Sequence, residues 1–156
     1  MRAIDVHVHP STRGLDRDAC TYFRRNLNEV PQTAEAFADL YIKHDVKAPL
    51  IGWHPSTVKE GSQNSNEHVI ELAARFPDAF PGILGALDIH ADDLNAVAHY
   101  AQDLARNPKV LGFKFHPPDQ GFYPTERRLY PIWEVLQGSG KPVMFHVGFT
   151  VLGADT

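Results

Sequence analysis

The sequence has very little cysteine, no long apolar run and no excess of basic residues. Its 156 residues include one cysteine, Cys20, which excludes a disulfide framework or a thiolate metal cage and favours a reduced, cytoplasmic setting. No stretch approaches the ~18 apolar residues of a membrane span, and Asp5 interrupts the apolar N-terminus, so we expect neither a membrane span nor a signal sequence. There are 15 Lys and Arg against 19 Asp and Glu, a formal net charge of −4. This balance argues against nucleic acid or an anionic membrane as a partner.

Several apolar stretches have the pattern of β-strands. They alternate apolar with polar residues, or run between turn residues such as proline and glycine. The predicted strands are 4–9, 46–53, 82–89, 110–116 and 142–148. Pro49 lies inside the second of these and removes a hydrogen-bond donor from its ladder. In 110–116 the alternation predicts one face with Leu111, Phe113 and Phe115, and the other with Lys114 and His116.

Helical periodicity occupies the segments between these strands. The predicted helices are one capped by Thr33, one that follows Asn66, one capped by Asp92 or Asp93, and one with Pro131 in its first turn. A further helix is expected around 16–27, inside the long polar connection 11–32.

The alternation of strands with helices predicts an α/β fold with a parallel sheet and right-handed crossovers. Polar residues end the first, fourth and fifth strands on one periodic face, which is typical of the inner wall of a TIM-type (β/α)8 barrel. Such a barrel takes about 250 residues when complete. We therefore expect residues 1–156 to form one domain, a partial barrel with about five of the eight units.

The run Ile4-Asp5-Val6-His7-Val8-His9-Pro10 carries the first candidate metal ligands. His7 and His9 share a face of the predicted strand with Cα atoms roughly 6.6 Å apart, close enough for both imidazoles to bind one ion. Pro10 ends the strand, so the pair lies at a carboxyl end, where α/β folds place catalytic groups. Two half-buried polar residues without a metal are the alternative. Asp5 either orients a ligand imidazole or satisfies neighbouring polar groups, and we favour the second role.

His146 is the third candidate ligand. It follows the apolar residues Val143-Met144-Phe145 in the last predicted strand, and on a barrel it would face His7 and His9 across the mouth. Three imidazoles suit zinc or a similar divalent ion and leave a coordination position for water or substrate. The alternative is a hydrogen-bonded core histidine.

Three more residues are candidates for substrate binding. Lys114 binds a substrate carboxylate or, if carbamylated, bridges two metal ions; His116 contacts substrate or supports the ligands. The alternative is that Lys114 lies at the rim and forms an ion pair with an acidic residue. His116 is then held in place only by the prolines that follow it. Arg13 follows the first strand and has the guanidinium geometry to bind an anionic substrate through two hydrogen bonds.

Four runs of the sequence together carry a family resemblance. They are Ile4-Asp5-Val6-His7-Val8-His9, Ala74-Arg75-Phe76-Pro77-Asp78 with Gly82 onward, Leu111-Gly112-Phe113-Lys114-Phe115-His116-Pro117, and 142–148. In these runs the chain resembles the amidohydrolase superfamily, specifically the amidohydrolase-related branch that contains aminocarboxymuconate semialdehyde decarboxylase and hydroxybenzoate-type decarboxylases alongside hydrolases. The resemblance implies that His7, His9 and His146 bind one catalytic divalent metal ion.

The resemblance also implies two groups that these residues do not contain. One is a histidine on strand six that acts as acid or base, and the other is an aspartate on strand eight that binds the metal or the proton. Both are expected beyond Thr156, so the chain resembles the N-terminal portion of the barrel. Strands one and five would then have open edges, which predicts pairing with a second copy or with a complementing chain.

These observations favour a metal-dependent hydrolase or decarboxylase that acts on a small carboxylated or cyclic substrate. The residues do not separate hydrolysis from decarboxylation. The rival hypotheses are a non-catalytic α/β module that binds a metal or a small ligand, and an inactive truncated product.

Overall fold

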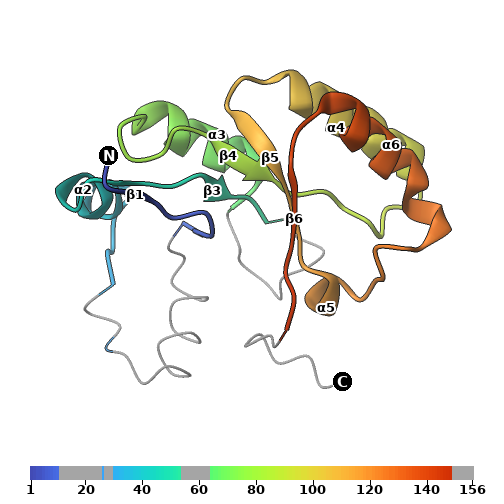
Figure 1. Cartoon of the computed structure of the whole chain (residues 1–156), viewed down its shortest axis with the longest axis horizontal. Coiled ribbons are helices and arrows are strands. Elements are labelled where there is room, and N and C mark those ends of the chain that lie inside the picture. The colour runs from blue at the N-terminus through green and yellow to red at the C-terminus, as the bar shows by residue number, and fades with distance from the viewer. Residues whose placement is uncertain (11–25, 27–29, 54–63, 149–156) are drawn as a thin grey trace.

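The computed structural model describes residues 1–10, 26, 30–53 and 64–148, along which strands alternate with helices (Figure 1). The strands are β1 (Ala3–Ile4), β2 (Val46–Lys47), β3 (Leu50–Ile51), β4 (Ile83–Gly85), β5 (Val110–Phe115) and β6 (Val143–Phe145). The helices are α2 (Ala34–Lys43), α3 (Asn66–Arg75), α4 (Leu94–Arg106), α5 (Pro117–Gln120), the 3₁₀ helix η3 (Arg127–Leu129) and α6 (Tyr130–Ser139).

All the strand pairs are parallel, as the alternation of strands and helices predicts. β1 pairs with β2, and β3, β4, β5 and β6 pair in that order. Val8 forms a bridge with Leu50, and the Ile51 N–H donates to the Val8 carbonyl over 2.8 Å. The first segment of the chain therefore runs beside both β2 and β3, and the strands form one continuous row from β1 to β6. The predicted α/β class with parallel βα units is confirmed.

Three predicted strands are shorter or less regular than expected. The strand predicted for 46–53 divides into β2 and β3 around Pro49, and the N–H of Ala48 donates instead to the Ala79 carbonyl over 3.0 Å. β4 ends at Gly85 because the side chain of Asn66 takes both backbone groups of Ala86, each over 2.8 Å. β1 ends early because Asp5 Oδ1 accepts a local hydrogen bond from the N–H of His7.

Leu111 does not share the environment of Phe113 and Phe115, contrary to the prediction from alternation. Its side chain is 40% exposed, whereas those of Phe113 and Phe115 are buried. The cause is a register shift between β4 and β5: Ile83 pairs with Val110, but the next residue pairs with Gly112. Leu111 is the extra residue of this bulge and turns away from the core.

The helix starts follow the predicted capping residues closely. The Thr33 hydroxyl accepts from the N–H of Ala36 at the start of α2, and Asp93 Oδ1 accepts from two N–H groups in the first turn of α4. At α3 the cap is Ser65, and Asn66 is the first helical residue rather than the one before it. Pro131 lies in the first turn of α6, as predicted. The helix predicted around 16–27 lies outside the described residues.

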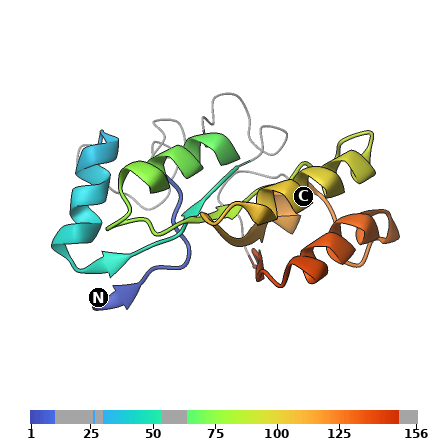
Figure 2. The same cartoon turned by 90° about the horizontal axis from the view of Figure 1, so that it is seen from above.

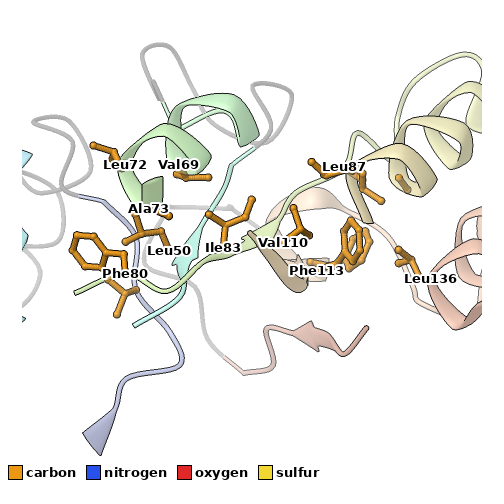
Figure 3. Close-up of a cluster of buried hydrophobic side chains, with 14 of the residues drawn as sticks. Leu50, Val69, Leu72, Ala73, Phe80, Ile83, Leu87, Val110, Phe113 and Leu136 are labelled. Carbon is orange, nitrogen blue, oxygen red and sulfur yellow. The ribbon is translucent and has the colours of Figure 1, made fainter. Parts of the chain in front are cut away.

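The core lies between the row of strands and the helices that cover its outer face. α4 and α6 pack side by side (Figures 1 and 2). Figure 3 shows the side chains that fill the layer, among them Leu50, Val69, Leu72, Ala73, Phe80, Ile83, Leu87, Val110, Phe113 and Leu136. This packing directs the other face of the strands, which carries Lys114 and His116, away from the helices.

The row of strands is strongly curved. Four strand-to-strand steps of about 4.8 Å would hold β1 and β6 roughly 19 Å apart in a flat sheet. The ring centroids of His7, after β1, and His146, after β6, are 6.0 Å apart. The row therefore curves so that side chains from its two ends face each other at the carboxyl end, as they do across the mouth of a barrel. No helix in the described part of the chain is both long and apolar enough to cross a bilayer.

Candidate active site

Four histidines meet at the carboxyl end of the strands. The ring centroids of His7 and His9 are 5.3 Å apart, and those of His7 and His146 are 6.0 Å apart. His116, after β5, stacks on His146 with centroids 3.8 Å apart and planes 18° from parallel. The structure thus brings together all three predicted metal ligands and one predicted substrate contact.

Asp5 fixes the backbone beneath His7 rather than its imidazole. Its Oδ1 accepts from the N–H of His7 over 3.1 Å, and its Oδ2 accepts from the Tyr41 hydroxyl over 3.4 Å. Burial and the neighbouring Asp5 carboxylate raise the pKa of Tyr41 to about 12, so its hydroxyl keeps its proton. Asp5 therefore satisfies neighbouring polar groups, the favoured prediction for it.

Trp53 is a neighbour of His9 that the sequence did not mark. Its indole Nε1–H donates a hydrogen bond to Nδ1 of His9, and the ring centroids are 4.9 Å apart. Because Nδ1 accepts this proton, a neutral His9 carries its own proton on Nε2. The position of Trp53 directly before His54-Pro55 is the signal that places it at the end of a strand.

Burial and neighbouring positive groups favour the neutral form of His7, His9 and His116. Desolvation, followed by the charges of His7 and Lys114, lowers the pKa of His9 to about 3. Desolvation is also the largest cause that lowers the pKa of His116, to about 4, and that of His7 below its ordinary value. Neutral imidazoles have a free lone pair, the form that binds metal ions.

Lys114 lies in a small cavity beside the histidines. The cavity holds about 20 Å³, enough for one water, and Lys114, His9, Trp53, His116 and Gln120 are among its lining residues. Lys114 is only 6% exposed, and desolvation lowers the pKa of its ammonium group. Its ammonium group makes no hydrogen bond within the described part of the chain, which leaves this group available to a ligand.

The short helix α5 holds His116 in place. The N–H of His116 donates to Gln120 Oε1 over 2.7 Å, and Gln120 Nε2 donates to the Leu87 carbonyl over 3.4 Å. His116 Nδ1 lies 3.1 Å from Asp119 Oδ2. Sequence reasoning missed α5, Asp119 and Gln120, because Pro117-Pro118 reads only as the end of a strand.

The donor set fits a borderline divalent ion in chemistry and spacing. Tetrahedral coordination with Zn–N distances of about 2.1 Å places imidazole centroids roughly 5 Å apart, near the 5.3 and 6.0 Å observed here. Within the described residues, however, no three His, Cys, Asp or Glu side chains are arranged as a finished metal site. His9 Nδ1 accepts from Trp53, so His9 offers a lone pair to an ion only once this hydrogen bond is broken. The predicted contact Arg13 lies outside the described residues.

A family model described as "Amidohydrolase" matches residues 4–156. Among solved structures, the chain is similar to 5-carboxyvanillate decarboxylase from Sphingomonas paucimobilis, with a TM-score of 0.59 and 14% identity over 92% of this chain and 51% of that one. It is also similar to a protein described as amidohydrolase II, with a TM-score of 0.61 and 16% identity over 98% of this chain and 53% of that one. The chain thus spans about half the length of these structures. No curated protein matches its sequence significantly.

Proposed function

Because the chain belongs to the amidohydrolase family, we propose that it provides the metal-binding strands of a metal-dependent hydrolase or decarboxylase. In this proposal His7, His9 and His146 hold one divalent ion, and imidazole ligands favour zinc. The observation that carries it is the approach of His7 and His146 to 6.0 Å from opposite ends of the row of strands. When bound, such an ion lowers the pKa of a coordinated water or polarises a substrate oxygen.

The protein's own residues then bind and orient a small carboxylated or cyclic substrate. Lys114 is proposed to bind a substrate carboxylate, because its ammonium group is nearly buried and makes no hydrogen bond within the described residues. His116 lines the same cavity and supplies a hydrogen bond to the substrate. Arg13 is proposed as a second contact to an anionic group.

A small carboxylated acid is a proposed substrate for decarboxylation as well as for hydrolysis. One structural neighbour is 5-carboxyvanillate decarboxylase, which makes decarboxylation a reaction to test first. We also propose that the acid–base histidine and aspartate come from the remainder of the barrel, as the family resemblance implies. The setting proposed for this reaction is the cytoplasm.

The two outer strands are the proposed contacts for that remainder. Ile4 and Val6, on the first strand segment, are each 56% exposed, and Val147, just after β6, is 83% exposed. Exposed apolar residues on open strand edges favour pairing with further strands. A complementing chain or a second copy would cover them.

Native mass spectrometry of the 156-residue chain, with and without a chelator, tests the metal site. We expect one chelatable zinc per chain, lost when His7, His9 or His146 is replaced by alanine. His99→Ala is the matched control, because His99 is exposed on α4, remote from the strand ends. A chain that stays metal-free in the presence of zinc would refute the proposal.

A non-catalytic binding module is the second candidate. It is favoured by the contacts that the rings make with each other, His116 on His146 and Trp53 on His9, and by the lack of a finished metal site among the residues that the structure describes. An activity screen against carboxylated aromatic acids and lactones separates the two candidates. Chelator-sensitive turnover supports the enzyme, and ligand binding without turnover supports the module.

A further inference from the structure

The side chain of Asn66 interrupts the hydrogen-bond ladder between β3 and β4. The N–H of Gly52, just after β3, donates to the Leu84 carbonyl over 2.9 Å, as a parallel ladder requires. The next bond of such a ladder would run from the N–H of Ala86 to the Gly52 carbonyl. The N–H of Ala86 donates instead to Asn66 Oδ1 over 2.8 Å. The ladder therefore ends at Gly52, because a side chain takes the place of the neighbouring strand.

Asn66 also leaves no room for a side chain at position 52. A Cβ atom on Gly52 would lie 2.7 Å from Asn66 Oδ1, whereas its next neighbours, in Ala86 and Val69, would be at an ordinary 3.6 Å. Gly52 does not have a positive φ, so its backbone conformation does not call for glycine. The oxygen of Asn66 thus lies between the ends of β3 and β4, where the side chain of another residue would be.

Three hydrogen bonds fix the amide of Asn66 in this position. Its Oδ1 accepts from the N–H of Ala86, and its Nδ2 donates to the Ala86 carbonyl over 2.8 Å and to the Tyr100 hydroxyl over 3.0 Å. The Tyr100 hydroxyl in turn donates to Glu67 Oε1 over 3.1 Å. Asn66 is only 6% exposed, so water does not replace these bonds if the amide is removed.

The cavity at Lys114 lies at the strand ends that Asn66 separates. Gly52 and Ala86 both line this cavity, together with Lys114 from β5. A direct hydrogen bond between Ala86 and Gly52 would draw the two ends to the usual strand spacing of about 4.8 Å. The space beside the ammonium group of Lys114 therefore depends on the interrupted ladder.

We propose that Asn66 is a positioning residue that holds the ends of β3 and β4 apart, and so keeps the cavity open to one oxygen of a ligand carboxylate that binds Lys114. Asn66 does not line the cavity itself. It acts through the two backbone segments that it separates. The carboxylate as occupant rests on the proposed function, whereas the separation of the strand ends does not.

NMR scalar couplings across hydrogen bonds read the ladder directly in the ¹³C,¹⁵N-labelled 156-residue chain. We expect the amide nitrogen of Ala86 to couple to the side-chain carbonyl carbon of Asn66. In Asn66→Ala we expect this nitrogen to couple to the carbonyl carbon of Gly52 instead. A coupling between Ala86 and Gly52 in the unsubstituted chain would overturn the inference. So would its absence in Asn66→Ala, because the strand ends would then stay apart without Asn66.

Acetate is the probe for the cavity, and the amide shifts of the lining residues report its binding. We expect Lys114→Met to abolish binding. Lys109→Met is its control, because the ammonium group of Lys109 donates to the Ala73 carbonyl. Asn66→Ala should weaken acetate binding several-fold. Asn95→Ala, at an exposed asparagine in the first turn of α4, should leave it unchanged.

Gly52→Ala separates this role of Asn66 from a general effect on stability. In the unsubstituted chain the new methyl group should displace the Asn66 amide and weaken acetate binding several-fold. In the Asn66→Ala background it meets nothing closer than 3.6 Å and should have no further effect. Losses that multiply in the double variant would overturn the inference.

The two measurements also separate this inference from the proposed function. If the unsubstituted chain does not bind acetate, Lys114 is refuted as a carboxylate site, and with it the proposed substrate contact. The couplings of Ala86 then still decide whether Asn66 separates the strand ends. If acetate binds equally well to the unsubstituted chain and to Asn66→Ala, the contact at Lys114 stands and the role of Asn66 is refuted.

Discussion

The strands at the centre of the row are almost completely buried, whereas those at its two ends are not. In β4 every residue is buried, and in β5 only Leu111 is exposed. Both residues of β1 are exposed, and β6 is half-buried. We call β4, β5, α4 and α6 the packed region, and residues 1–9 with 143–148 the site edges.

The three proposed metal ligands lie in the site edges, and the packed region between them decides where they meet. β5 contributes Lys114 and, at its end, His116 to the same cavity. The packed region thus provides stability and curvature, while the site edges provide chemistry. Substitutions in the two regions should therefore have separable effects on folding and on metal binding.

The largest expected effect is on stability, from a substitution in the packed region. Phe113→Ala should lower the free energy of unfolding by about 3–5 kcal/mol, because Phe113 is completely buried and its loss leaves a cavity. Leu111→Ala on the same strand should cost less than about 1 kcal/mol, because Leu111 is 40% exposed. Urea denaturation of the two variants measures both. Equal losses would contradict the division into two regions.

The opposite effect is expected from the site edges. His146→Ala should lower zinc affinity by more than about 100-fold. Replacing a residue that only hydrogen-bonds to a metal ligand already lowers metal affinity by about 10–100-fold. The free energy of unfolding of the metal-free chain should change by no more than about 1 kcal/mol, since β6 is only half-buried. Calorimetric titration with zinc tests the expected loss of affinity, and urea denaturation tests the expected stability. A variant that unfolds would place His146 in the packed region.

The pH dependence of stability should report the neutral histidines of the site edges. Folding lowers the pKa of His9 from 6.5 to about 3, so between these two pH values the unfolded chain binds more protons than the folded chain. The contribution of His9 to the free energy of unfolding is then fully present above about pH 6.5. It falls as the pH drops towards 3, by up to about 1.4 kcal/mol per pH unit. His9→Asn should flatten this slope in urea denaturation at pH 4 to 6.5. An unchanged slope would show that His9 titrates normally.

The smallest effect concerns the contact between Trp53 and His9. Trp53→Phe removes the donor to His9 Nδ1 and should strengthen zinc binding by about 2- to 10-fold, the range of one hydrogen bond of 0.5–1.5 kcal/mol. Trp133→Phe is the control, because Trp133 Nε1 donates to the Pro124 carbonyl instead. Competition with a zinc-binding dye measures both affinities. Weaker binding by Trp53→Phe would mean that Trp53 supports the ligand rather than competing with the ion.

Much of the fold could be predicted because its signals are local. Thr33 and Asp93 cap their helices as predicted, and Pro131 lies in the first turn of its helix. The same local reasoning placed Lys114 and His116 on the face opposite Phe113 and Phe115. It failed at Leu111, because the bulge between β4 and β5 depends on a partner strand that periodicity does not contain.

The sequence by itself determined the α/β class, the parallel strands, the family resemblance and the kinds of side chain at the strand ends, because periodicity, capping and turn residues act within a few neighbouring positions. Only the tertiary structure decided that His7 and His146 approach to 6.0 Å and that Trp53 donates to His9. These contacts join residues from different strands and loops. They depend on the accumulated twist and register of the whole row of strands, which no short stretch of sequence contains.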